Sequence, residues 1–369
     1  MKIGVLTSSR ADFGIYLPLI KILDKDAKVD LRIIAFGTHL SKSHGYTLDE
    51  IEEHEFKSID KIQVNFSDDS PKGISKTYGE VCLKFASYWA DHKYDLVFCL
   101  GDRFEMQAAV QAGIPLRVKF THIHGGETTE GAIDNIYRHQ ISLASSVHFA
   151  STTSYKNRLT QLLGHDQKIY NVGSLSLDEI VNLSLPSMQE VCQEFQIPES
   201  NYILTTFHPE TVSIEYNEAY VNEMSMALQI LADSYQIVIT MPNADTMGSI
   251  YRSAILKLAE KHDNVYIVES FGKMNYFTVM KNALCILGNS SSGIIEAATF
   301  GKYVVNVGDR QKGRQQSQNV MNVSFDSRQI IDAVKTAIAH SNYEGENIYY
   351  QKNVAMSIIN VLKKELSNA

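Results

Sequence analysis

Short apolar segments alternate with amphipathic segments along the whole chain. In the first half, apolar runs of four to six residues show no helical period, which is typical of strands buried inside a parallel sheet. These runs predict strands at 3–7, 31–36, 95–100, 117–122, 147–150 and 169–172. The segments between them repeat apolar residues at helical spacing and predict helices at 15–23, 48–53, 74–90, 104–112 and 154–163, with a further helix beginning at Asp134.

The second half shows the same alternation. Its apolar runs predict strands at 202–207, 236–241, 265–268, 284–287 and 304–307, the last of which is expected to be the final core strand. Its amphipathic segments predict helices at 217–232, 250–261, 271–281 and 294–299, followed by a closing helix at 353–366. Because strand and helix alternate throughout, each half is predicted to form a doubly wound parallel sheet of the α/β class.

This repeated alternation predicts two domains, which agrees with a length of 369 residues at about 150 residues per domain. The segment 183–198 has two prolines and mixed polarity, so it is the predicted domain junction. We therefore predict a Rossmann-like N-terminal domain at 1–182 and a second Rossmann-like domain at 183–350. The helix within 351–369 is expected to pack back on the N-terminal domain.

The composition is that of a soluble globular protein, with 44% apolar and 21% charged residues. The formal net charge of −8 argues against nucleic-acid binding, since proteins that bind nucleic acid are normally basic. No apolar run approaches the ~20 residues needed to span a bilayer, and the first residues resemble a strand more than a signal peptide. The cysteines at 82, 99, 192 and 285 form no C-x-x-C pair, which predicts reduced thiols and a cytoplasmic protein.

The strand predicted at 95–100 ends in an informative polar pair. Gly101 permits a sharp turn, and Asp102 and Arg103 follow it, directly before the helix at 104–112. Ligands of open α/β sheets bind at the carboxyl ends of the strands. An acid beside a guanidinium at that place suits a substrate that carries phosphate and needs a proton moved. The alternative is a strand-end salt bridge that caps the helix.

Ionisable residues are dense after the strand predicted at 117–122. Within 18 residues the chain has six of them, namely His122, His124, Glu127, Asp134, Arg138 and His139. Gly125 and Gly126 permit close approach of the backbone to a ligand, and Asp134 and Arg138 share one helix face. The alternatives are a solvated helix face or a zinc site, which needs three or four preorganised donors. We expect a substrate site because the cluster follows a strand and contains two adjacent glycines.

Two other turns offer groups that bind anions. Residues 8–14 supply two serine hydroxyls, backbone N–H groups and Arg10. Residues 308–314 bring three cations, among them Arg310, within five positions, which indicates phosphate binding or a solvated loop. No predicted strand is followed by G-x-G-x-x-G, which argues against a Rossmann nicotinamide site.

The turn at 288–293 is the third candidate for phosphate. It combines two glycines, an asparagine and three serines directly before the helix predicted at 294–299. Hydroxyls and orphan N–H groups at a helix start form an anion cradle. Glu296 is placed to accept from a ribose diol, and its alternative role is a first-turn acid that favours the helix dipole.

In this combination the chain resembles the hydrolysing UDP-N-acetylglucosamine 2-epimerases of sialic-acid and legionaminic-acid biosynthesis. The resemblance covers nearly the whole chain and rests on the motifs at 9–14, 101–103, 122–127, 134, 138–139, 207–210, 243–245, 288–293 and 308–314. It implies a GT-B-like pair of Rossmann-type domains around an interdomain cleft, without a cofactor. It also implies conversion of UDP-N-acetylglucosamine to N-acetylmannosamine and UDP.

The implied mechanism is elimination to a glycal followed by rehydration, because carbon 2 of the sugar has no adjacent carbonyl to acidify its proton. In the family, three acidic residues are catalytic, and Asp102 and Asp134 match two of them. His124 occupies the middle position, where many relatives have glutamate. His124 or the nearby Glu127 is therefore expected to serve there, since a neutral imidazole is an effective base near pH 7.

The resemblance also implies the residues that contact the nucleotide sugar. His208 is expected to protonate or stabilise the departing phosphate and is grouped with the catalytic residues. The implied substrate-binding residues are Arg10, Arg103, Arg138, His139, Asn243, Ser290, Ser291, Ser292, Gly293, Glu296 and Arg310. No metal ligand is expected.

Three other functions are compatible with these residues. Some relatives act on UDP-N,N′-diacetylbacillosamine, and residues 72–76 and 129–131 look similar to that subgroup. A GT-B glycosyltransferase would need an acceptor. A nucleotide-sugar sensor would bind UDP without turnover, and the cluster of carboxylates and histidines argues against it. We expect a UDP-sugar as the partner, neither nucleic acid nor membrane, and a homodimer or homotetramer.

Overall fold

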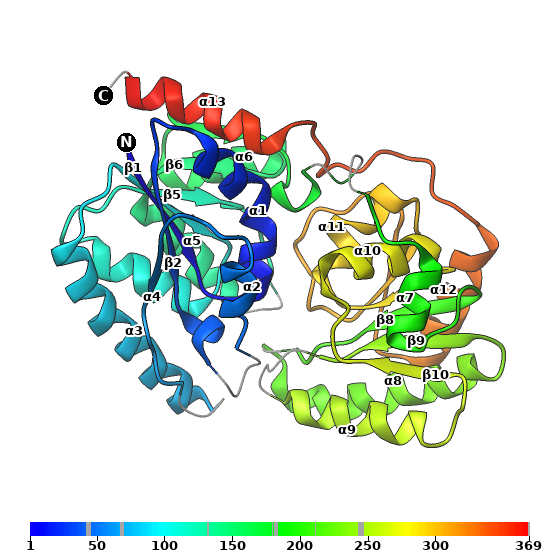
Figure 1. Ribbon diagram of the computed structural model, residues 1–369. Coiled ribbons are helices and arrows are strands. Elements are labelled where there is room, and N and C mark those ends of the chain that lie inside the picture. Colours follow the sequence, from blue (N-terminus) through cyan, green and yellow to red (C-terminus); the bar gives the residue numbers. More distant parts are fainter. Residues whose placement is uncertain are drawn as a thin grey trace. The chain divides into compact units, whose positions relative to one another are not determined.

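The computed structural model describes residues 1–41, 46–66, 70–130, 133–178, 180, 184–210, 212–242 and 247–367. The chain forms two compact units (Figure 1). Unit 1 consists of Met1–Glu127, Asp134–Val181 and Tyr349–Ala369, and unit 2 consists of Thr128–Ile133 and Asn182–Ile348. Each unit contains its own parallel sheet, which confirms the predicted fold class of two doubly wound α/β domains.

The sheet of unit 1 has seven strands within the described residues, in the order β3-β2-β1-β4-β5-β6-β7. Its strands are β1 (Lys2–Thr7), β2 (Asp30–Ala35), β3 (Ile59–Lys61), β4 (Leu96–Leu100), β5 (Phe120–Ile123), β6 (Ser145–Ala150) and β7 (Ile169–Asn171). Neighbouring strands pair in parallel. The strand order reverses between β1 and β4, and ligands of open α/β sheets bind beside the carboxyl ends of the strands at such a switch point.

Helices cover both faces of this sheet. They are α1 (Arg10–Lys25), α2 (Leu48–Glu52), α3 (Pro71–Asp91), α4 (Phe104–Gly113), α5 (Asp134–Ala144), α6 (Thr153–Leu163) and α13 (Val354–Ser367), with the 3-10 turns η1 (Gly37–Leu40) and η3 (Leu175–Leu177). Successive residues of β4 point to opposite faces, so Phe98 packs with α1 and α13 while Cys99 packs with α3 and α4. Trp89 of α3 is fully buried in the second of these clusters.

Two expectations for unit 1 were wrong in detail. The helix expected from residue 15 begins at Arg10, so most of the turn expected at 8–14 is helical. Ser9 caps this helix by accepting from the Asp12 N–H, and these local bonds set a start that apolar periodicity does not show. Strand β3 was not expected, because three residues at a sheet edge are too few for a periodic signal.

Unit 2 has a six-stranded sheet within the described residues, in the order β10-β9-β8-β11-β12-β13. Its strands are β8 (Tyr202–Thr206), β9 (Gln236–Thr240), β10 (Val265–Val268), β11 (Ile286–Gly288), β12 (Val304–Val307) and β13 (Val320–Val323). Its helices are α7 (Met188–Phe195), α8 (Asn217–Ala232), α9 (Gly248–Ala259), α10 (Gly272–Asn282), α11 (Ser291–Ile295) and α12 (Ser327–Ala339), with the 3-10 turns η4 (Ile214–Tyr216) and η5 (Ala297–Phe300). The strand order reverses between β8 and β11.

Unit 2 also departs from the sequence-based expectations. Helix α7, which was not predicted, lies inside the segment 183–198, because Ser187 and Glu190 form a capping box and Val191 packs into the core. The strand at 304–307 is not the last one, since β13 pairs with it in parallel. Helix α11 begins at Ser291 instead of 294, because the Ser290 side chain caps it.

The C-terminal helix α13 belongs to unit 1 (Figure 1). Ile358 and Leu362 lie in the same core cluster as the buried residues of α1. The carboxylate of Asp178 accepts from the N–H groups of Val354 and Ala355 at 2.9 Å each, and so satisfies the start of the helix.

None of the helices in the described ranges combines the length and the apolar composition that a membrane crossing needs. The cysteines are free thiols, and Cys99 and Cys285 are buried, as expected for small apolar residues inside a sheet.

Candidate active site

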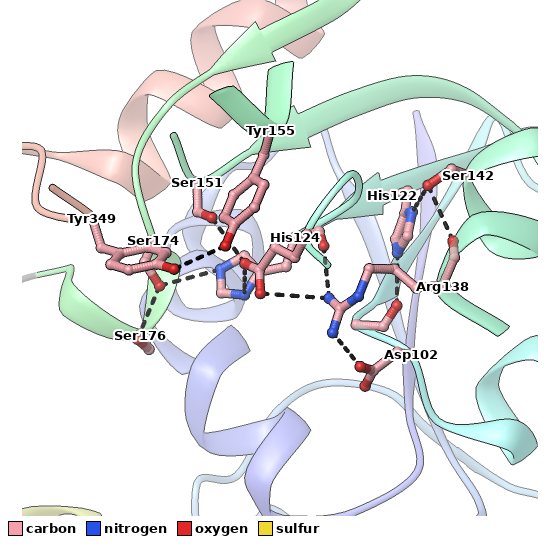
Figure 2. A network of polar contacts seen from close by, with 12 residues as sticks. Asp102, His122, His124, Arg138, Ser142, Ser151, Tyr155, Ser174, Ser176 and Tyr349 are labelled. Carbon is pink, nitrogen blue, oxygen red and sulfur yellow. Dashed lines mark hydrogen bonds and ion pairs between the residues drawn. The ribbon is translucent and has the colours of Figure 1, made fainter. Parts of the chain in front are cut away.

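Asp102 stands directly after β4, at the switch point of the unit 1 sheet. Gly101 before it has a φ of +71°, the left-handed conformation that glycine adopts readily. The side chain of Asp102 is 23% exposed, so its carboxylate is open to a ligand on one side. On the other side it forms an ion pair with Arg138 of α5 (Figure 2).

Arg138 is the organising residue of this cluster. Its guanidinium is buried and binds Asp102 through Nη2, while Nη1 donates to the His124 carbonyl at 2.9 Å (Figure 2). Nη1 also lies 3.6 Å from Oε2 of Glu127. A buried cation is tolerated only when opposite charges and hydrogen bonds compensate it, and here two carboxylates and a carbonyl do so. At this position Arg138 holds the carboxylates of Asp102 and Glu127 in place.

His122 of β5 fixes the backbone beside Asp102. Its Nε2 donates to the Gly101 carbonyl at 2.9 Å, and its Nδ1 lies 3.0 Å from the Ser142 hydroxyl of α5. Burial lowers the pKa of His122 well below its usual range, so the ring is neutral near pH 7. Asp102 is therefore oriented twice, at its backbone by His122 and at its carboxylate by Arg138.

His124 and Glu127 follow β5 and are both buried. The Ser151 hydroxyl donates to Glu127 Oε1 at 2.8 Å, and the Leu175 N–H donates to His124 Nε2 at 3.3 Å. Glu127 Oε1 lies 3.6 Å from His124 Nδ1, beyond hydrogen-bond distance but close enough for electrostatic attraction. The structure thus brings Asp102, His124, Glu127 and Arg138 into one network.

The other predicted residues of unit 1 lie around this network. Asp134 is the first residue of α5, one helical turn before Arg138, and its side chain is half-buried. His139 is half-buried, and burial, with Arg158 and Arg138 adding to it, lowers its pKa. Arg10 forms an ion pair with Glu50 at 3.1 Å, measured from Nε to Oε1.

Arg103 pairs with Glu105 of α4, through Nε and Oε1. Asp102 does form a salt bridge at the end of β4, and the partner that the structure shows for it is Arg138 of α5. Arg103 occupies the N-cap position of α4 without a side-chain cap bond.

In unit 2 the predicted residues follow three neighbouring strands, β8, β11 and β12. Asn289, directly after β11, links them although its side chain is fully buried. Its Oδ1 accepts from the His208 N–H at 2.7 Å, and its Nδ2 donates to the His208 carbonyl at 2.8 Å. Its carbonyl accepts from Arg310 Nη1 at 3.2 Å and from Gln311 Nε2 at 2.9 Å. One asparagine therefore fixes His208 and Arg310 relative to each other.

The serine turn lies at the start of α11. Ser290 caps the helix, and its hydroxyl is 3.1 Å from that of Ser292, which is 2.8 Å from the Tyr276 hydroxyl. Ser291, Ser292 and Gly293 form the first turn. Glu296 is mostly buried and follows the last residue of α11, so its alternative role as a first-turn acid of that helix is wrong.

Glu210 holds the turn after β12 in place. Its Oε1 accepts from the Asp309 N–H at 2.6 Å, next to Arg310. Burial raises the pKa of this carboxyl, and the backbone N–H groups that it accepts from oppose the shift. Gly308, with a φ of +77°, is required because a Cβ there would lie 2.5 Å from Glu210 Oε1.

Asn243 lies outside the described residues. Across the part of the chain that the structure describes, no group of three or more His, Cys, Asp or Glu side chains is arranged to hold a metal ion. The structural roles of Asn289, Glu210 and Ser151 were not predicted. Asn289 lies inside the motif at 288–293, which the sequence did indicate as a phosphate site. Its position between Gly288 and Ser290 was the signal that could have pointed to its role.

Two parallel-sheet units with polar strand-end turns define the GT-B-like fold, which solved structures share. The UDP-GlcNAc 2-epimerase from Neisseria meningitidis bound to UDP-GlcNAc superposes with a TM-score of 0.83 and 20% identity, covering 99% of this chain and 100% of that one. The model of the UDP-N-acetylglucosamine 2-epimerase family matches residues 21–363. The chain belongs to this family and is an enzyme of it.

Curated relatives extend the match. The chain is 33% identical over 349 residues to the UDP-N,N′-diacetylbacillosamine 2-epimerase (hydrolyzing) of Legionella pneumophila, covering 94% of this chain and 92% of the relative. It is 32% identical over 323 residues to the GDP/UDP-N,N′-diacetylbacillosamine 2-epimerase (hydrolyzing) of Campylobacter jejuni, covering 87% and 83%.

Proposed function

We propose that this enzyme is a hydrolysing 2-epimerase that converts UDP-N-acetylglucosamine and water to N-acetylmannosamine and UDP. The observation that carries the proposal is the Asp102 carboxylate, partly exposed at the switch point and held by a buried guanidinium. A group that removes a proton needs both access to the substrate and a fixed orientation, and Asp102 has both. The family membership supplies the class of substrate.

The reaction follows from the chemistry of the sugar. A base removes the C2 proton while the C1–O bond to UDP breaks, which gives a glycal with a C1=C2 double bond. Water then adds its oxygen to C1, and a proton is delivered to C2 on the opposite face. Two acid–base groups are needed, one for each face of the ring, and we assign them to Asp102 and Asp134.

Arg138 is proposed to act indirectly. It lies buried between Asp102 and Glu127, so it sets the orientation of Asp102 without touching the sugar. Glu127 neutralises the guanidinium on its other side. Three other residues of unit 1 are also proposed to contact the substrate. They are His139, next to Arg138 in α5, and Arg10 and Arg103 near strand ends.

The turns of unit 2 are proposed to bind the diphosphate that leaves. Ser290, Ser292 and Arg310 offer hydroxyls and a positive charge, and Asn289 fixes Arg310 beside His208. Charge that develops on the departing phosphate is stabilised best by donors that are already oriented. His208 is proposed to stabilise or protonate that phosphate, and Glu296 and Asn243 to contact the nucleoside.

A second candidate substrate is UDP-N,N′-diacetylbacillosamine. It is favoured by a specific observation, since the relatives that are 33% and 32% identical both carry that substrate in their names. The reaction at C1 and C2 is the same for both sugars. The difference lies at C4 and C6, and the same network around Asp102 serves either one.

The test is a product assay on purified protein without added metal or nicotinamide. UDP-N-acetylglucosamine and UDP-N,N′-diacetylbacillosamine are supplied separately, UDP is measured by anion-exchange chromatography and the free sugar by NMR. We expect UDP and a free sugar inverted at C2, and the larger kcat/KM identifies the substrate. Absence of UDP from both reactions would overturn the proposal, and UDP released only when a sugar acceptor is present would identify a glycosyltransferase.

Assembly and location also stay predictions. A homodimer or homotetramer of the 41.4 kDa chain is expected, and sedimentation equilibrium measures it directly. A cytoplasmic location is expected from the reduced thiols.

A further inference from the structure

His124 has contacts on four sides within unit 1, and Figure 2 shows those with Arg138 and Ser174. Its backbone N–H donates to the Phe149 carbonyl and its carbonyl accepts from Arg138 Nη1, each at 2.9 Å. On the ring, the Leu175 N–H lies 3.3 Å from Nε2, and Glu127 Oε1 lies 3.6 Å from Nδ1. Its φ of +64° is a left-handed conformation that costs a non-glycine residue free energy, so these contacts must maintain it.

The contact with Leu175 determines where the ring carries its proton. A backbone N–H can only donate, so Nε2 must accept and carries no proton. The neutral ring then has its proton on Nδ1, the nitrogen that faces Glu127. The lone pair that a general base would use at Nε2 is directed at the Leu175 amide instead, with the Ser174 hydroxyl 3.3 Å away.

The surrounding groups agree with a neutral ring. Glu127, from the same strand-end segment, is the carboxylate that would favour an imidazolium. Arg138 from α5 opposes that charge, and His122 from β5 is itself neutral. Ser174, the N-cap residue of η3, lies nearby, and a protonated Nε2 would point its hydrogen at the Leu175 N–H. An imidazolium in this place would therefore lose its contact with η3.

We propose that His124 is a positioning residue and not the acid or base that handles the C2 proton. The ring places its Nδ1 3.6 Å from the Glu127 carboxylate, which it attracts electrostatically, and the carbonyl of His124 accepts from Arg138, which orients Asp102. The inference rests on the proposed function, and it leaves the proton transfers to Asp102 and Asp134. It therefore bears on the choice between His124 and Glu127 for the middle catalytic position, which the sequence leaves open.

The first test reads the tautomer without any turnover. Histidine labelled with ¹⁵N is incorporated into the whole chain, and long-range ¹H–¹⁵N correlations are recorded between pH 5.5 and 8, with His124 assigned by its absence from the His124→Gln spectrum. We expect a proton on Nδ1, none on Nε2, and no titration over this range. A proton on Nε2, or an imidazolium forming within the range, would overturn the inference.

The second test separates positioning from proton transfer. Glutamine at 124 can still accept from the Leu175 N–H, but it does not titrate. We expect His124→Gln to lower kcat by roughly tenfold to hundredfold, as a misplaced catalytic group does, while the acid limb of the pH–rate profile keeps its midpoint. Loss of that limb, or a kcat equal to that of the wild type, would contradict a positioning role.

A matched control uses His165, which is exposed after α6. His165→Gln is expected to keep the wild-type kcat and pH profile. If the wild type releases no UDP from either UDP-sugar, the proposed function fails, whereas the NMR measurement still decides the tautomer of His124. The two failures are therefore distinguishable.

Discussion

At the scale of single residues, the two units share one arrangement. In each, a buried polar side chain orients a side chain that is partly exposed. In unit 1, Arg138 is buried and orients Asp102, whose side chain is 23% exposed. In unit 2, Asn289 is buried and orients Arg310 and the backbone of His208. Buried polar groups must be satisfied by the protein, so such residues rarely change position when a ligand binds.

Asp102→Asn tests the proposed base directly. The amide is nearly isosteric and can still contact Arg138, so UDP should bind with an affinity within about twofold of the wild type. It cannot take a proton, so kcat should fall by about 10²- to 10⁴-fold. Isothermal titration with UDP and a UDP-release assay measure the two quantities, and a variant that keeps the wild-type kcat removes Asp102 from the mechanism.

Asn289→Ala tests the organising residue of unit 2. Removing a fully buried side chain that makes two hydrogen bonds to His208 should release the turns after β8 and β11, and UDP should bind at least tenfold more weakly. Asn319→Ala is the matched control, because Asn319 is also fully buried in unit 2, but its side chain bonds only to the Lys302 carbonyl among the described residues. Equal losses of UDP affinity in both variants would show that Asn289 acts only through stability.

At the scale of elements, the sequence predicted most strands and helices because buried parallel strands are short apolar runs with little ambiguity. The strands at 265–268 and 304–307 and the helix at 217–232 have the predicted bounds. Helix starts were missed where capping side chains decide them, as Ser9 and Ser290 do.

The elements that were missed share a physical reason. Strands β3 and β13 are edge strands, each paired on one side only, and their residues are only partly buried. Strand β3 contains two charged residues and β13 contains Asn322, so neither has the continuous apolar run that identified β10, which is also an edge strand. The contacts of the candidate site were unpredictable for a different reason, since Arg138 and Asp102 are 36 residues apart and only the folded sheet brings them together.

Helix α3 provides a prediction at this scale. A Cβ added at Gly79, in the exposed middle of the helix, would have no heavy atom within 4 Å, so Gly79→Ala should stabilise unit 1 by about 0.5–1 kcal/mol. Gly113 ends α4, where a Cβ would lie 2.6 Å from the Phe120 ring, so Gly113→Ala should destabilise it by about 1–3 kcal/mol. Urea unfolding followed by the fluorescence of Trp89, the single tryptophan, measures both. Shifts of the same sign in the two variants would contradict the packing described.

At the scale of the whole molecule, two sheets with separate cores hold separate parts of the proposed chemistry. The residues proposed for acid–base chemistry belong to unit 1, and the serine turn and Arg310 belong to unit 2. The segment Thr128–Ile133, between Glu127 and Asp134, belongs to unit 2, and its Glu130 N–H donates to the Lys312 carbonyl at 2.8 Å. Because Trp89 lies in the core of unit 1, its fluorescence reports the unfolding of that unit.

The stability of unit 1 is expected to depend on pH through buried histidines. Burial lowers the pKa of His39 from 6.5 to about 4, and that of His148 to about 4 as well. Below about pH 6.5 each of these two histidines binds a proton in the unfolded chain but not in the folded chain. The free energy of unfolding therefore has its full value above pH 6.5 and decreases as the pH falls toward 4, by about 3 kcal/mol per histidine.

The measurement is urea unfolding by Trp89 fluorescence at pH 7.0, 5.5 and 4.5. His39→Asn should show a smaller loss between pH 7.0 and 4.5 than the wild type, whatever its stability at pH 7.0. An equal pH dependence in the wild type and His39→Asn would contradict the assignment to His39.

The central claim is that the C2 proton is removed and replaced from solvent while UDP leaves C1. The most direct measurement is to run the reaction in deuterated water and to examine the freed sugar by NMR and mass spectrometry. The account predicts one deuterium at C2 in every product molecule, in the inverted configuration. A product that keeps its original hydrogen at C2 would contradict elimination and rehydration, whichever UDP-sugar is the substrate.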